Sequence, residues 1–165
     1  KVLAAKGQLA AAADLYRDAL EASPIAAVAA ELAEVEEIRG ERSASRDALA
    51  TAHELDRREQ ANGVLLELDA AATDADFRIP TAADVANARR GHHDRPGVIG
   101  DDALGWVLTR AGQCEEGLRY AQRSLRLGTR SALMHFHAGM AAHCAGADDD
   151  ARRHLQTALD IISQG

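Results

Sequence analysis

The sequence predicts an all-α protein, and three observations support that prediction. Hydrophobic residues make up 47% of the 165 residues but aromatic residues only 3%, so alanine and leucine supply most of the apolar surface. Small side chains favour helices and close contacts between them, whereas sheets prefer β-branched and aromatic residues. Only three prolines interrupt the chain, which leaves room for long helices. The third observation is an internal repeat with a period that suits pairs of helices.

Two glycine-centred segments repeat each other at an offset of 34 residues, since Gly112 aligns with Gly146 and 146 − 112 = 34. The same offset relates Leu104, Gly105, Gly117, Ala121, Ser124 and Leu125 to Ala138, Gly139, Ala151, Leu155, Ala158 and Leu159, in that order. Small residues recur where two helices must approach closely. Each segment is therefore predicted to form a helix, a tight turn at the glycine and a second, antiparallel helix.

These residues resemble the tetratricopeptide repeat family, whose units carry Leu-Gly, a turn glycine and then alternating small and large positions. Earlier in the chain, Leu3, Gly7, Ala12, Tyr16, Ala19, Leu20 and Pro24 match the second helix of such a unit, and Leu32, Gly40, Ser45, Leu49 and Ala52 match the next unit. The resemblance implies one domain over residues 1–165, an antiparallel helix-pair solenoid with a right-handed superhelix. Its five units would span about 1–25, 26–59, 60–97, 98–131 and 132–165, the first of them truncated.

The middle unit departs from the repeat. Gly40 and Gly112 are 112 − 40 = 72 residues apart, four more than two 34-residue units need. We expect its helices over 61–73 and 80–92, with the extra residues in the connector 74–79. Pro80 suits a helix start, and Thr129 or Ser131 and Asp148 suit the starts of the last two helices.

If the resemblance holds, the first helix of each unit lines a concave groove, and the family's groove positions carry over to this chain. They are Glu31, Glu34, Glu37, Ile38, Val64, Leu65, Leu68, Ile99, Asp102, Ala103, Trp106, Thr109, Arg110, Leu133, Phe136, His137, Met140, His143 and Cys144. Trp106, Phe136 and Met140 belong to the residue types enriched at interfaces. They predict an apolar docking patch, with Arg110 placed for a carboxylate. The alternative is that these large side chains only pack inside the fold.

The groove lacks the residues with which some members of the family bind acidic C-termini. Tetratricopeptide domains that hold acidic C-termini do so with lysine, arginine and asparagine. The matching positions here are Ala30, Glu34, Val64, Leu68, Asp102 and Trp106. The acidic residues Glu31, Glu34 and Glu37 instead favour a basic segment.

The histidines and cysteines do not predict a metal site or any cofactor. His135 and His137 point to different helix faces, and His137 and His143 are too far apart along a helix to share an ion. Cys144 follows His143, but the chain has no zinc-finger spacing, and three consecutive aspartates from Asp148 lack the alternation of a calcium loop. Cys114 and Cys144 could meet through antiparallel packing, so the sequence leaves two alternatives, a disulfide or two half-buried thiols.

Catalytic motifs are also missing from the sequence. It contains no nucleophile elbow and no phosphate-binding glycine loop. The paired carboxylates Asp101-Asp102 and Glu36-Glu37 are adjacent and should point in different directions around a helix. We expect a protein that is not an enzyme.

The net charge and the hydropathy of the sequence exclude two classes of partner, nucleic acids and membranes. The net charge is −7, and the arginines are spread along the chain, so nucleic acid is not expected. No apolar run reaches the length of a membrane span.

Two cysteines and the lack of a signal peptide make the cytoplasm the default compartment. Because the chain begins with Lys1, we expect it to be part of a longer protein. Arginine far outnumbers lysine, which indicates a GC-rich, bacterial genome.

The function predicted from these observations is a scaffold or adaptor that binds a peptide or helix of another protein in its groove. Two alternatives stay open. The apolar, uncapped ends, such as Leu159 to Ile162, could mediate self-association into a homo-oligomer, or the chain could be a regulatory domain of a larger protein.

Overall fold

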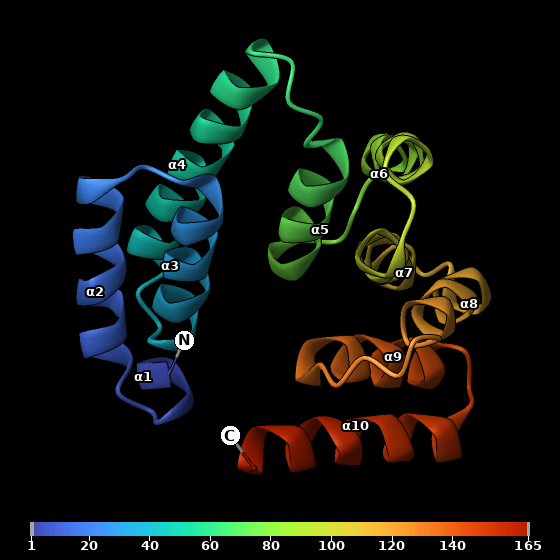
Figure 1. The fold of residues 1–165 in the computed structure, drawn as a ribbon. Helices are drawn as coiled ribbons and strands as arrows, with labels where there is room; N and C mark the ends of the chain where they lie inside the picture. Colours follow the sequence, from blue (N-terminus) through green and yellow to red (C-terminus); the bar gives the residue numbers. More distant parts are fainter. Residues whose placement is uncertain (1, 165) are drawn as a thin grey trace. The chain divides into compact units, whose positions relative to one another are not determined.

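The protein is all-helical. A computed structural model describes residues 2–164, and ten helices cover most of this range (Figure 1). Contacts divide the chain into two compact units, Lys1–Val64 and Leu65–Gly165, and each is described by itself. The boundary lies just after Gly63, whose φ of 86° ends a long helix with a left-handed residue.

The first unit is built around one central helix. Its helices are α1 (Val2–Ala5), α2 (Leu9–Ala22), α3 (Ala26–Ile38) and α4 (Arg42–Ala61). α3 packs against both α2 and α4. Ala29, Ala30 and Ala52 form its buried cluster with Leu20 against them. Alanines at these contacts let the helix backbones approach closely, and they leave little apolar area to bury.

A buried charge links helices of this unit. Glu36 of α3 is 1% exposed. Its carboxylate accepts hydrogen bonds from Arg17 of α2 and from Arg39, the latter at 2.7 Å. A buried carboxylate is tolerated only when it is paired in this way.

The second unit carries six helices, α5 (Glu67–Phe77), α6 (Ala82–Asp94), α7 (Val98–Arg110), α8 (Cys114–Ser124), α9 (Ala132–Cys144) and α10 (Asp148–Ser163). Each helix packs against the next one in sequence, and α7 also packs against α5 and α9. α7 therefore has four neighbours and lies at the middle of the unit (Figure 1). Its residues Leu104, Val107 and Leu108 are at most 1% exposed and form the centre of the core.

Glycines allow α7 and α8 to touch through their backbones. A Cβ on Gly105 would lie 2.9 Å from the backbone nitrogen of Ala121, and one on Gly117 would lie 2.4 Å from the Thr109 hydroxyl. The turn glycine between the two helices, Gly112, has a φ of 77°. The predicted helix–turn–helix segments around Gly112 and Gly146 are thus present as α7–α8 and α9–α10.

Of the two helices predicted for the middle unit, the second agrees with α6 to within two residues at each end, and the first was misplaced. α4 continues to Ala61, and α5 begins at Glu67 and ends at Phe77 rather than covering 61–73. Residues 62–66 form the connection, so the four extra residues lengthen α4 and its link instead of the segment 74–79. The cause is that Asn62-Gly63 ends α4 with a left-handed glycine, a signal that we did not use.

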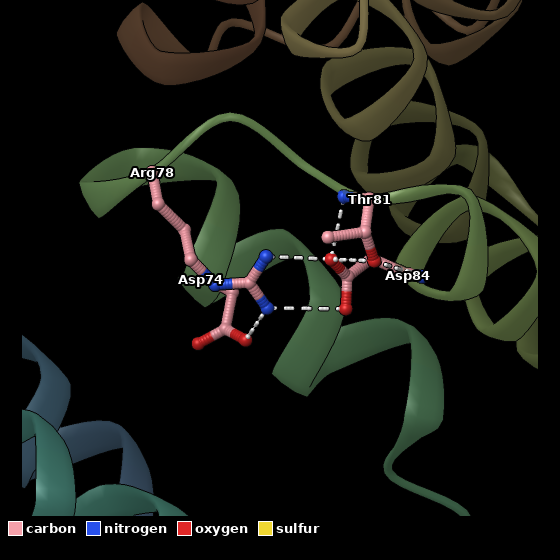
Figure 2. A network of polar contacts seen from close by, with 4 residues as sticks. All are labelled: Asp74, Arg78, Thr81 and Asp84. Atoms are coloured by element: carbon pink, nitrogen blue, oxygen red, sulfur yellow. Dashed lines mark hydrogen bonds and ion pairs between the residues drawn. The ribbon is translucent and has the colours of Figure 1, made fainter.

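A polar network fixes the short connection between α5 and α6 (Figure 2). The Arg78 guanidinium donates to Asp84 at 2.6 Å and to Asp74 at 2.5 Å. Thr81 caps α6, with the Asp84 amide donating to its hydroxyl and its own amide donating to the Asp84 carboxylate. The hydrogen bond from Arg78 is the largest cause that lowers the pKa of Asp84. The first residue of α6 is therefore Ala82, with Thr81 as its N-cap, and Pro80 precedes the cap rather than occupying the first turn.

A disulfide joins Cys114, the first residue of α8, to Cys144, the last residue of α9, with their Cα atoms 5.2 Å apart. Of the two alternatives that the sequence left open, the structure has the bond. It ties the end of α9, the first helix of the α9–α10 pair, to the start of α8, the second helix of the α7–α8 pair, across a separation of 30 residues.

Removing this disulfide should destabilise the second unit. For a closed loop of 30 residues, the double variant Cys114→Ser/Cys144→Ser should lose about 3.6 kcal/mol of unfolding free energy, measured by urea denaturation. A thiol reductant should lower the unfolding free energy of the wild type and leave that of the variant unchanged. The reducing compartment expected from the sequence would instead keep both groups as thiols. Two titratable thiols in protein purified without reductant, with no effect of the double substitution, would contradict the bond.

Candidate functional site

Three helices of the second unit, α5, α7 and α9, bring the predicted aromatic residues together. The Trp106 ring of α7 stacks on the His137 ring of α9, with centroids 4.3 Å apart and planes 14° apart. The Phe136 ring lies 5.9 Å from the Trp106 ring. The Trp106 indole N–H donates to Oδ1 of Asp76 on α5 at 2.8 Å. We call Trp106, Phe136 and His137 the aromatic cluster.

Exposure separates the members of this cluster. Trp106 and His137 are only 5% and 7% exposed, whereas Phe136 is 40% and Leu133 is 59% exposed. Met140 is partly buried against the core, and the Arg110 guanidinium lies 5.5 Å from the centroid of the Trp106 ring. The surface available to a partner is therefore Leu133, Phe136 and Met140 on α9. Trp106 lies beneath it as a support, contrary to its predicted place as a contact residue.

Carboxylates lie beside the aromatic cluster. Oδ2 of Asp102 is 3.0 Å from Nδ1 of His137, and its other oxygen, Oδ1, is buried without a hydrogen-bond partner. Desolvation raises the pKa of Asp76, while the Trp106 hydrogen bond and the charges of His137 and Arg110 oppose that rise. Both acids are thus held by the same residues that build the cluster.

Other predicted groove residues of this unit have different roles. Leu68 is 2% exposed and belongs to the core. His143 is exposed and lies 3.4 Å from the Asp148 carboxylate, and Cys144 is in the disulfide. None of these three residues extends the exposed apolar surface of α9.

The predicted acidic residues Glu31 and Glu34 belong to the first unit and are described apart from the aromatic cluster. The Tyr16 hydroxyl of α2 donates to Glu31 on α3 at 3.0 Å. Desolvation, with the nearby charges of Glu31 and Glu34, raises the pKa of Tyr16 to about 12. Among their neighbours on the predicted face, Ile38 is 69% exposed.

A second polar network was not predicted. Asp101 is fully buried, and its carboxylate contacts His92 Nε2 at 2.8 Å and the guanidinium of Arg126. Asp101 therefore points toward α6 and α8, while Asp102 points toward α9. The expectation that these adjacent carboxylates diverge is confirmed, and neither is available to act with the other as an acid–base pair.

Two histidines face each other across α9 and α10. Nδ1 of His135 lies 3.1 Å from Nδ1 of His154. Desolvation is the largest cause that lowers the pKa of both, and for His154 the His135 charge adds to it. Helical spacing relates His135 only to histidines of its own helix, so this pair across two helices was not predicted.

The described residues carry neither a cluster of metal ligands nor a membrane-spanning helix. Between residues 2 and 164 no group of three or more His, Cys, Asp or Glu side chains is placed to hold a metal ion. No helix in this range is both long and apolar enough to span a bilayer. Neither the protein-family models nor the curated proteins contain a match to the chain.

The histidine pair should make stability depend on pH. Both pKa values are lowered in the fold, so the unfolded chain binds protons more readily. The stabilising contribution is present above the unfolded pKa of about 6.5 and is lost as the pH falls from there through the lower pKa values of the folded state. Urea denaturation from pH about 7.5 to about 5 should show a smaller loss of unfolding free energy in His135→Gln/His154→Gln than in the wild type. His93→Gln, at an exposed histidine, is the control, and equal losses in all three proteins would refute the assignment.

Proposed function

We propose that this protein is a non-catalytic interaction module that binds a peptide or helix of another protein on α9. The observation that carries the proposal is the apolar row formed by the exposed Leu133 and Phe136 and the partly buried Met140, which the buried Trp106–His137 stack supports from beneath. These three residues follow one another at intervals of three and four, so they share one side of the helix.

The surroundings of this row suit an apolar partner segment. Phe136 contacts rings that are already fixed by stacking and by the Asp76 hydrogen bond, so it loses little freedom on binding. Arg110 lies over the Trp106 ring that supports the row, and its guanidinium can pair with a carboxylate of the partner. Anchors of this type, aromatic side chains on a rigid support, supply most of the energy at interfaces.

The resemblance to tetratricopeptide repeats supports the same surface. In that family the first helices of successive repeats line the binding groove. In the compact unit Leu65–Gly165, α5, α7 and α9 correspond to these first helices. α7 packs against both α5 and α9, as successive first helices of such an array would. The non-catalytic part of the proposal rests on Asp76 and His137, whose side chains contact the Trp106 indole N–H and Oδ2 of Asp102, respectively.

A displayed random-peptide library selected against the folded protein tests this surface. Selected peptides should bind Leu133→Ala and Phe136→Ala at least about tenfold more weakly than the wild type. Leu159→Ala on α10 is a matched control, because Leu159 is 61% exposed against 59% for Leu133. Circular dichroism confirms that each variant is folded. Peptides that bind all four proteins equally would overturn the proposal.

Self-association through α10 is the second candidate function. The observation that favours it is the exposure of Leu159 and Ile162, at 61% and 59%, on a helix whose other side packs against α9. Light scattering over a concentration series should then show a mass that rises with concentration, and Leu159→Asp should abolish the rise. A constant monomer mass would exclude it.

A further inference from the structure

The His135–His154 pair has the geometry of a metal chelate. The two residues come from different helices of one hairpin, α9 and α10, and their Nδ1 atoms are 3.1 Å apart. Two nitrogens bound to the same ion at about 2.0–2.1 Å lie roughly 2.8–3.4 Å apart when the angle at the ion is between square and tetrahedral. The observed separation lies within this range, and a rotation of the two imidazole rings, whose centroids are 5.4 Å apart, would turn both Nδ1 lone pairs toward one ion.

The backbone around the pair is held in place by close packing. Gly139 lies one helical turn after His135, and Leu155 directly follows His154. A Cβ on Gly139 would lie 2.7 Å from Cγ of Leu155, so α9 and α10 are as close here as a glycine allows. This contact fixes the register of the two helices next to the imidazoles, and preorganisation of this kind favours chelation over single-site binding.

The chemistry of the ligands selects the class of ion. Imidazole nitrogen suits Zn²⁺, Ni²⁺ and Cu²⁺, whereas Ca²⁺ and Mg²⁺ prefer oxygen. Desolvation keeps both rings neutral near pH 7, so protons compete weakly with a metal. The charge of Asp150, one turn before His154 on α10, favours a cation, and that of Arg153 opposes it. Arg153 is itself paired with Asp150 at 2.7 Å.

We propose that His135 and His154 form a two-imidazole site for a divalent first-row transition metal ion of the Zn²⁺, Ni²⁺ or Cu²⁺ class, with water completing the coordination. Without metal, one Nδ1 donates its proton to the other. In the bound state both rings carry their proton on Nε2. The ring that donated from Nδ1 therefore changes tautomer, its proton moving from Nδ1 to Nε2, and the pair as a whole loses no proton.

Calorimetric titration of the folded chain with ZnCl₂ and NiCl₂, in buffer without thiol reductant, tests the site. The wild type should bind one ion, His135→Gln and His154→Gln should each bind at least about tenfold more weakly, and the double variant should not bind. MgCl₂ should give no heat of binding. His93→Gln, which changes an exposed histidine of α6, should match the wild type.

Two further readouts keep the result decisive. Saturating Zn²⁺ should raise the unfolding midpoint of the wild type and leave that of the double variant unchanged, since only a ligand of the folded state stabilises it. Imidazole ¹⁵N spectra of the wild type should show the Nδ1 signals of these two rings shifting on Zn²⁺ addition, which tests the site even where a variant folds poorly. Equal affinity in the double variant would place the ion elsewhere, for example at His143 and Asp148, and would overturn the proposal, as would unshifted Nδ1 signals.

Discussion

Close packing of α7 against α5, α6, α8 and α9 is the constraint on which the second unit depends. Gly105 and Gly117 let α7 and α8 meet through their backbones, and Leu104 and Leu108 fill the centre. A core with few aromatic residues has little apolar area for each contact, so its stability relies on short distances between many small groups. The same closeness recurs between α9 and α10 at Gly139, where it sets two histidines face to face.

Buried polar groups then fix the rotation of α7 about its axis. Asp101 is held by His92 and Arg126 on one side, and Asp102 lies against His137 on the other. A rotation of α7 would leave both carboxylates buried without partners, at a cost of several kcal/mol for a charged group. Because the rotation is fixed, Trp106 must face α5 and α9, and Phe136 and Leu133 are left at the surface above it. The proposed binding surface is thus a consequence of the core.

The sequence predicted the helix pairs well where the repeat is regular and poorly elsewhere. The turn at Gly112 and the cap at Ser131, whose side chain accepts from the Met134 amide, follow from local signals that need no tertiary contact. The helix predicted over 61–73 was wrong. The repeat period places a helix across Asn62-Gly63, where a left-handed glycine ends α4. Among the site residues, the proximity of Trp106 and Phe136 was predicted, but the burial of Trp106 was not, because Asp76 and His137 cover it from helices distant in sequence.

By itself, the sequence determined the class of the fold and the order of its helices. Composition, helical periodicity and turn glycines determine where helices form and end through interactions within one or two helical turns. These features can therefore be identified from the sequence alone. Only the tertiary structure decided which groups meet across helices. The Cys114–Cys144 bond, the Asp101 network and the His135–His154 pair each join residues 9 to 30 positions apart. Their distances depend on how tightly and at what rotation two helices pack, and no local pattern in the chain specifies either quantity.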